Sequence, residues 1–159
     1  LQITGDKHVL LWPPSDHDAL GVEGSSSPIV HLASPDTQHY PAYPAAEPLF
    51  AALRPGDVLF IPALWLHNVH CASGFSVSVN AFWRHLPPRC YDAKDLYGNR
   101  DLVQANAADK AVDAAGAELS TLPPHYAHFY GARALSRLAR RLAMPRGYLE
   151  RWALAASSG

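Results

Sequence analysis

The sequence predicts a mainly β domain with an α-helical appendage, and three observations support this prediction. The first half carries short β-rich runs separated by Pro and Gly. The segment "FSVSVNAFW", residues 75–83, alternates apolar and polar side chains with a period of two. Beyond about Asn99 the apolar residues recur instead at helical spacing. We therefore expect two regions, a β-rich domain over residues 1–92 and a helical region over residues 93–159.

The first strands are expected at the start of the chain. In "LQITGDKHVLLWPP" two β-rich runs flank Thr4-Gly5-Asp6, a pattern that is typical of a hairpin turn. Residues 13–50 are rich in Pro, Gly and Ser and predict mainly loops. The tetrapeptide "RPGD" predicts a turn, and the apolar run after it predicts a strand over residues 57–61.

The strand predicted at residues 75–83 has one polar face. Ser76, Ser78 and Asn80 share that face with Phe82, and the other face is apolar. A half-solvated strand is the usual reason for such a pattern. In a small barrel the polar face instead lines a central pocket. The alternation by itself is compatible with both arrangements.

The helical region predicts two helices. The first is indicated by apolar residues at helical spacing: Ala105, Ala108, Val112, Ala115 and Leu119. The segment "STLPPHY" supplies an N-cap followed by proline in the first turn of the next helix. We expect this second helix from His125 to Met144, ended by Pro145.

Length and charge set the broad class of the protein. A chain of 159 residues is the size of one domain, and a net charge of -1 indicates no partner. The charge is nevertheless uneven, because residues 131–159 hold 6 Arg and one Glu, whereas residues 1–130 hold 7 Lys/Arg and 13 Asp/Glu. A cationic tail of this kind often contacts a polyanion.

The cationic residues recur at i, i+4, i+7 and i+8, which places them on one face of the second helix: Arg133, Arg137, Arg140 and Arg141. Leucines occupy the opposite face: Leu135, Leu138 and Leu142. A solvated cationic face on a packed helix and a phosphate-binding face both fit this pattern.

The two cysteines, Cys71 and Cys90, lie at no zinc-like spacing and predict free thiols in an intracellular protein, cytoplasmic or nuclear. No apolar run approaches the ~20 residues that span a bilayer, so we expect no membrane segment.

Three polar residues on the predicted strands are candidates for a binding or catalytic site: Lys7, His67 and Asn80. His67 follows the apolar stretch "LRPGDVLFIPALWLH", and Lys7 shares a strand face with Val9. Taken separately, each has an ordinary interpretation: His67 is a hydrogen-bonded core residue, Lys7 reaches water, and Asn80 is structural. The functional interpretations are that His67 binds a metal ion, Lys7 binds an anion and Asn80 contacts a ligand.

Together these segments resemble a known family. "GDVLFIPALWLHNV" followed by "VSVNAFW" resembles the carboxyl half of a JmjC-type cupin, an Fe(II)- and 2-oxoglutarate-dependent oxygenase with a double-stranded β-helix fold. "QITGDKHVLLWPP" resembles the hairpin that carries that family's co-substrate lysine. "NAFWRHLPPRCYDAKDLYGNRD" and "LPPHYAHFYGARAL" are similar to its tRNA wybutosine-synthesising hydroxylases. Residues 1–92 would then be a partial JmjC domain.

The resemblance implies a role for each candidate residue. His67 would be the distal iron ligand of a two-histidine, one-carboxylate triad. Lys7 would pair with the far carboxylate of 2-oxoglutarate, and Asn80 would hydrogen-bond near its metal-chelating end. Trp65 and Phe82 would be pocket walls, although core positions explain them equally well. The arginine face would contact tRNA, and the same helices would support a homodimer.

The sequence departs from the family in one respect. The triad also needs a His-x-Asp or His-x-Glu pair upstream of the lysine hairpin, and His17-Asp18 lacks the intervening residue. We therefore expect the chain as given to be inactive. It would be a fragment of a hydroxylase that acts on a wybutosine precursor in phenylalanine tRNA. The alternatives are a JmjC protein hydroxylase and a non-catalytic truncated cupin that serves as a dimerisation or RNA-binding module.

Overall fold

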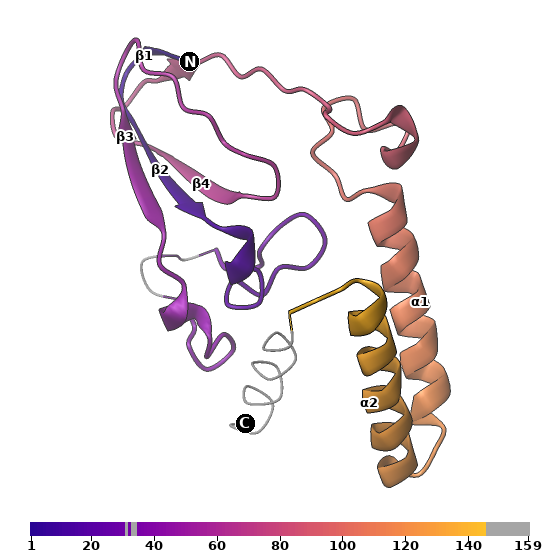
Figure 1. The fold of residues 1–159 in the computed structure, drawn as a ribbon. Helices are drawn as coiled ribbons and strands as arrows, with labels where there is room; N and C mark the ends of the chain where they lie inside the picture. The colour runs from indigo at the N-terminus through magenta and orange to yellow at the C-terminus, as the bar shows by residue number, and fades with distance from the viewer. Residues whose placement is uncertain (31, 33–34, 146–159) are drawn as a thin grey trace. The chain divides into compact units, whose positions relative to one another are not determined.

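The structure is a computed structural model that describes residues 1–30, 32 and 35–145 (Figure 1). The chain divides into two compact units, Leu1–Val103 and Gln104–Gly159. The first unit is built from β-strands and the second from α-helices. The predicted class, mainly β with a helical appendage, is confirmed.

A three-stranded antiparallel sheet forms the centre of the β unit. Strand β2 (Lys7–Trp12) lies between β3 (Leu49–Leu53) and β4 (Leu66–Cys71) (Figure 1). Lys7 lies opposite Leu53 on one neighbour and Cys71 on the other. Because β2 is the central strand, both of its edges are hydrogen-bonded, and its sequence KHVLLW is mostly apolar, as suits a strand inside a sheet.

A second, two-stranded sheet pairs β1 (Gln2–Thr4) with β5 (Val77–Ser78). The predicted hairpin between the first two strands is therefore wrong, since β1 and β2 belong to different sheets. The chain does bend at Gly5, with φ +70°. A Cβ atom at Gly5 would lie 2.1 Å from the carbonyl oxygen of Phe75, so this bend packs directly on the backbone that leads into β5. That contact directs β1 to β5 instead of to β2.

Strand lengths differ from the prediction. Residues 57–61 form no strand, because backbone pairing here is limited to Gly56 and Asp57, which bond to Gln2. Of residues 75–83, only β5 pairs in a ladder. Conversely, strand β3 begins at Leu49, within residues 13–50, for which the sequence predicts mainly loops. It forms because β2 offers hydrogen-bond partners along one edge. Three short 3₁₀ helices interrupt the loops: η1 (Pro14–Asp16), η2 (Tyr43–Ala45) and η3 (Pro88–Cys90).

The core of the β unit is small and centres on β2. Val9, Leu11 and Trp12 are 2%, 8% and 2% exposed, respectively. Loop residues add to the core: Leu20, Ile29 and Tyr91. Burial of these β2 side chains holds the strand that carries Lys7 in a fixed position.

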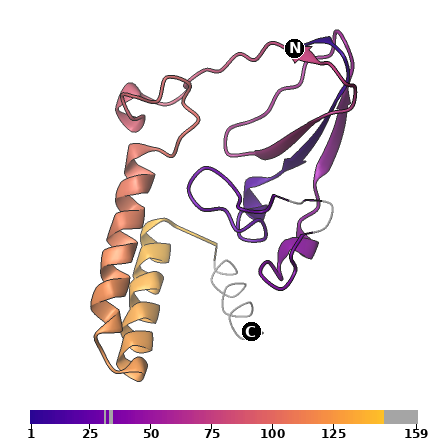
Figure 2. The same cartoon turned by 180° about the vertical axis from the view of Figure 1, so that it is seen from behind.

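The second unit contains helices α1 (Val103–Ser120) and α2 (Pro124–Arg141), as predicted. The two helices lie side by side (Figure 2). Gly131 of α2 lies against Leu119 of α1, whose Cδ1 would be 3.8 Å from a Cβ at position 131. The expected side-chain N-cap of α2 is wrong. Pro123 occupies that position, and the nearby hydroxyls of Ser120 and Thr121 donate to carbonyls of α1 instead.

Helix α2 ends three residues earlier than predicted, at Arg141, and Ala143 adopts φ +51° beyond it. No residue of α1 or α2 is buried within the part of the chain that the structure describes. Neither helix is long and apolar enough to cross a membrane, and the same holds for the other described residues.

Candidate functional site

Lys7 links the two sheets of the β unit. Its side chain is half-buried at the start of β2, and its Nζ donates a hydrogen bond to the Oγ of Ser78 on β5, 2.5 Å away. A charged donor makes such a bond stronger than one between neutral groups. The ammonium group is thus bonded to the polar face of the segment 75–83.

Gln2 and Ser76 continue the polar surroundings of Lys7. The Gln2 side chain is 1% exposed, and its Nε2 lies 2.8 Å from the Oγ of Ser76 and 2.6 Å from the carbonyl oxygen of Gly5. Its Oε1 is buried and has no hydrogen-bond partner among the described residues. We call Gln2, Lys7, Ser76 and Ser78 the Lys7 cluster. Two alternate residues of the predicted polar face, Ser76 and Ser78, therefore point toward β1 and β2.

His67 lies on β4 opposite Leu11, whereas Lys7 lies opposite Cys71. Residues paired across an antiparallel ladder share a face, and Lys7 and Leu11 are an even number of residues apart on β2. Lys7 and His67 therefore occupy one face of the sheet, about 14 Å apart along the strands at ~3.4 Å per residue. This face carries a cation at one end and an imidazole at the other.

The imidazole of His67 is exposed, and its Nδ1 lies 3.4 Å from the carbonyl oxygen of Trp65. A proton on Nδ1 would point to this carbonyl and leave the lone pair of Nε2 for a metal ion. The distance is at the long end of the hydrogen-bond range, so this orientation is weakly held.

A metal site needs more than His67. The described residues contain no group of three His, Cys, Asp or Glu side chains that could hold a metal ion. In non-haem oxygenases with a facial triad, Fe(II) takes two histidines and one carboxylate. The described residues by themselves therefore do not fit an iron centre.

The other predicted site residues are less closely connected. Asn80 is exposed and follows β5 by two residues. Trp65 is half-buried in the turn before β4. Phe82 is 60% exposed, and its ring contacts that of Tyr97 edge to face at 5.8 Å. In the described part of the chain, no hydrogen bond or ring contact joins these three residues to the Lys7 cluster.

All four arginines of the predicted cationic face lie on α2 and are exposed. The ion pairs found among the described residues join His17 to Asp18 and His39 to Asp36, so none of them neutralises this face. Arg133 instead lies over the ring of Tyr130, 5.7 Å from its centroid. The positive charge of α2 is therefore presented to solvent.

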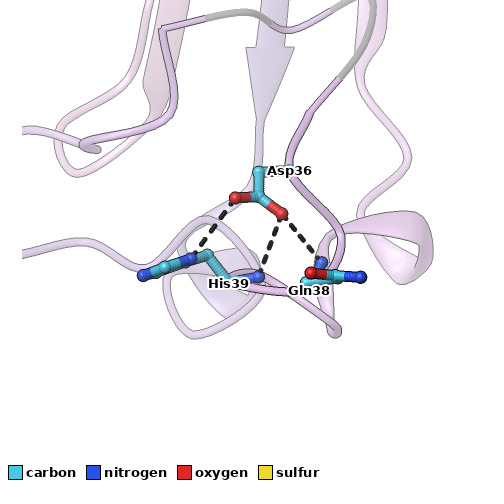
Figure 3. A network of polar contacts seen from close by, with 3 residues as sticks. All are labelled: Asp36, Gln38 and His39. Carbon is cyan, nitrogen blue, oxygen red and sulfur yellow. Dashed lines mark hydrogen bonds and ion pairs between the residues drawn. The ribbon is translucent and has the colours of Figure 1, made fainter.

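A second polar network, in the loop before η2, is local. Asp36 accepts hydrogen bonds from the backbone N–H groups of Gln38 and His39, and its other oxygen lies 3.3 Å from the His39 ring (Figure 3). The backbone bond from His39 lowers the pKa of Asp36 below its ordinary 3.8. All of these contacts lie within one exposed turn, so they stabilise the loop and form no site.

Sequence reasoning did not assign Ser78 or Gln2 to the site. Ser78 lies on the same predicted polar face as Asn80, so the period-two pattern indicated it as a candidate. Gln2 gave no such signal, because a single amide in a short β-rich run predicts no particular partner. Only the pairing of β1 with β5 places Gln2 opposite Ser78, the hydrogen-bond partner of Lys7.

Comparison with known proteins gives one family and several relatives. The family described as "Cupin-like domain" matches residues 1–89. The mouse protein "tRNA wybutosine-synthesizing protein 5" is 44% identical over 138 residues, which cover 87% of this chain and 44% of the relative. Its zebrafish namesake is 45% identical over 140 residues, 88% of this chain and 43% of the relative.

The "tRNA wybutosine-synthesizing protein 4" of Aspergillus oryzae is 37% identical over 142 residues, which cover 89% of this chain but 13% of that protein. The chain thus spans less than half the length of these curated relatives. The aligned stretches are longer than the family match over residues 1–89, so the similarity extends into the helical region.

Proposed function

The chain belongs to the cupin-like domain family, and from this membership we propose that it is part of a tRNA-modifying enzyme of wybutosine synthesis. The observation that carries this proposal is the extent of the similarity. A family match over residues 1–89 would fit many cupins, but the relatives named for wybutosine synthesis also match the helical region. The cationic α2 supports the same substrate, because exposed arginines without anionic partners among the described residues suit the phosphates of an RNA.

More specifically, the enzyme is an Fe(II)- and 2-oxoglutarate-dependent hydroxylase of a wybutosine precursor in phenylalanine tRNA. When bound, the iron and 2-oxoglutarate supply the oxidising chemistry. Lys7, positioned by Ser78, receives the far carboxylate of 2-oxoglutarate on the sheet face that it shares with His67. His67 supplies one imidazole, and Asn80 contacts the chelating end of the co-substrate. The remaining ligands come from parts of the protein outside this chain.

The test is a hydroxylation assay with the full-length protein. Phenylalanine tRNA carrying the precursor is incubated with Fe(II) and 2-oxoglutarate, and its nucleosides are analysed by mass spectrometry. We expect one added oxygen atom with the wild type and loss of product with Lys7→Ala and His67→Ala. Lys94→Ala and His85→Ala, at exposed positions, are matched controls that should keep activity. No oxygen incorporation by the wild type would refute the hydroxylase.

A second candidate is a non-catalytic RNA-binding module. It is favoured by one observation, the lack of a three-ligand metal cluster among the described residues. It predicts that the full-length protein binds tRNA without iron-dependent turnover, so the same assay separates the two functions.

A further inference from the structure

One face of α2 combines aromatic and cationic side chains. Tyr126, Tyr130, Arg133, Arg137 and Arg140 follow i, i+4, i+7, i+11 and i+14 spacing, so they form a continuous stripe along the helix. Phe129 borders the stripe. We call these six residues the aromatic–arginine face.

The rings of this face are open to solvent. Tyr126, Phe129 and Tyr130 are 51%, 62% and 41% exposed. Large aromatic side chains usually dominate the contacts of a protein core, whereas each of these three leaves more than two-fifths of its surface exposed. The guanidinium of Arg133 lies over Tyr130, and the ring of Tyr130 contacts that of Phe129 at 5.3 Å. Cation and aromatic rings are thus already adjacent on the helix surface.

All six residues of the aromatic–arginine face are exposed, and the half-buried residues of α2 are others. Gly131 faces Leu119 of α1, and the half-buried positions of α2 are small residues: Ala127, Gly131 and Ala139. The helix hairpin is therefore compatible with an unoccupied aromatic–arginine face. A purely structural role would not require exposed rings and exposed arginines on the same stripe.

We propose that the aromatic–arginine face binds RNA at unpaired bases, with the rings stacking on bases and the arginines neutralising the adjoining phosphates. This rests on the proposed function, which makes tRNA the substrate. Arginines alone would serve any stretch of RNA backbone. Exposed aromatic rings add affinity only where base faces are free, as in a single-stranded loop, because the bases of a duplex are stacked on one another.

The experiment measures binding of the full-length protein to three probes: tRNA, a single-stranded oligoribonucleotide and a duplex RNA of the same length. Tyr130→Leu keeps an apolar side chain but removes the ring. We expect it to weaken single-strand binding by about 5- to 100-fold without changing the salt dependence. Arg137→Gln should reduce the slope of log affinity against log salt by about 0.7. Phe75→Leu and Arg54→Gln, both at exposed positions of the β unit, are matched controls.

Several outcomes would overturn this inference while leaving tRNA modification intact. One is a duplex that binds as tightly as the single strand; another is Tyr130→Leu binding like the wild type. In a third, the protein binds vesicles of phosphatidylserine and phosphatidylcholine with the same affinity as RNA, and Tyr130→Leu weakens both. If the wild type bound no tRNA but still bound the single strand through Tyr130, the proposed function would fail and the RNA-binding face would stand.

Discussion

Replacement of Gly5 by alanine perturbs the contact that brings β1, β2 and the segment before β5 together. Gly5 has φ +70°, a conformation that costs an L-residue about 1–2 kcal/mol. The new Cβ would lie 2.1 Å from the carbonyl oxygen of Phe75 and 2.9 Å from the Cα of Ser76. Both are backbone atoms, so relief needs a shift of the chain, which typically costs about 1–3 kcal/mol.

The loss is partly offset because alanine restricts the unfolded chain, by roughly 0.4–1 kcal/mol. We therefore expect Gly5→Ala to lower the free energy of unfolding by about 2–4 kcal/mol. Urea unfolding followed by tryptophan fluorescence should show a midpoint lower by roughly 0.7–4 M, for a slope of about 1–3 kcal/mol per M.

Two glycines provide matched controls. Gly74 has no atom within 4 Å of a built Cβ and no positive φ, so Gly74→Ala should leave the midpoint nearly unchanged. Gly116 lies inside α1 with open space around it, and Gly116→Ala should stabilise the helix by about 0.5–1 kcal/mol. An unfolding midpoint for Gly5→Ala equal to that of Gly74→Ala would show that the Gly5 contact is not close in solution.

Three further predictions concern single side chains. Ser78→Ala should raise the dissociation constant for 2-oxoglutarate in the full-length protein by roughly 10-fold, because Lys7 loses its hydrogen-bond partner. Ser76→Ala leaves that bond intact and should change the dissociation constant less. Titration calorimetry of the two variants tests this. Asp95 is 2% exposed and accepts hydrogen bonds from the backbone N–H groups of residues 98, 99 and 100. Asp95→Ala should therefore lower the free energy of unfolding, measured in urea, by about 3 kcal/mol, and Asp95→Asn should lower it less. Folding lowers the pKa of Asp36, so its contribution to stability is present above the unfolded value of 3.8 and is lost as pH falls through the lower folded value. In Asp36→Asn the free energy of unfolding should therefore fall less steeply as the pH is lowered through this range. An unchanged dependence on pH would contradict this prediction.

The sequence by itself determined the division into β-rich and helical parts and the family resemblance. Helical spacing is a local property, so both helices were predictable from neighbouring residues. The period-two pattern of residues 75–83 was a weaker guide, since only Val77–Ser78 of that segment pair as β5. The cationic stripe on α2 was predictable for the same reason, because helical periodicity alone places its arginines together.

Tertiary structure decided how these segments meet. The sequence around Gly5 predicts a hairpin, but a close backbone contact with Phe75 sends β1 to β5 and leaves β2 to pair with β3 and β4. Lys7 and Ser78 are 71 residues apart in the chain, and no local pattern specifies their hydrogen bond. Nor does the helical spacing state whether Tyr126 and Tyr130 are buried; their exposure follows from the small residues that α2 presents to α1. Pairing and burial depend on contacts between distant segments, and those contacts form only when the chain folds.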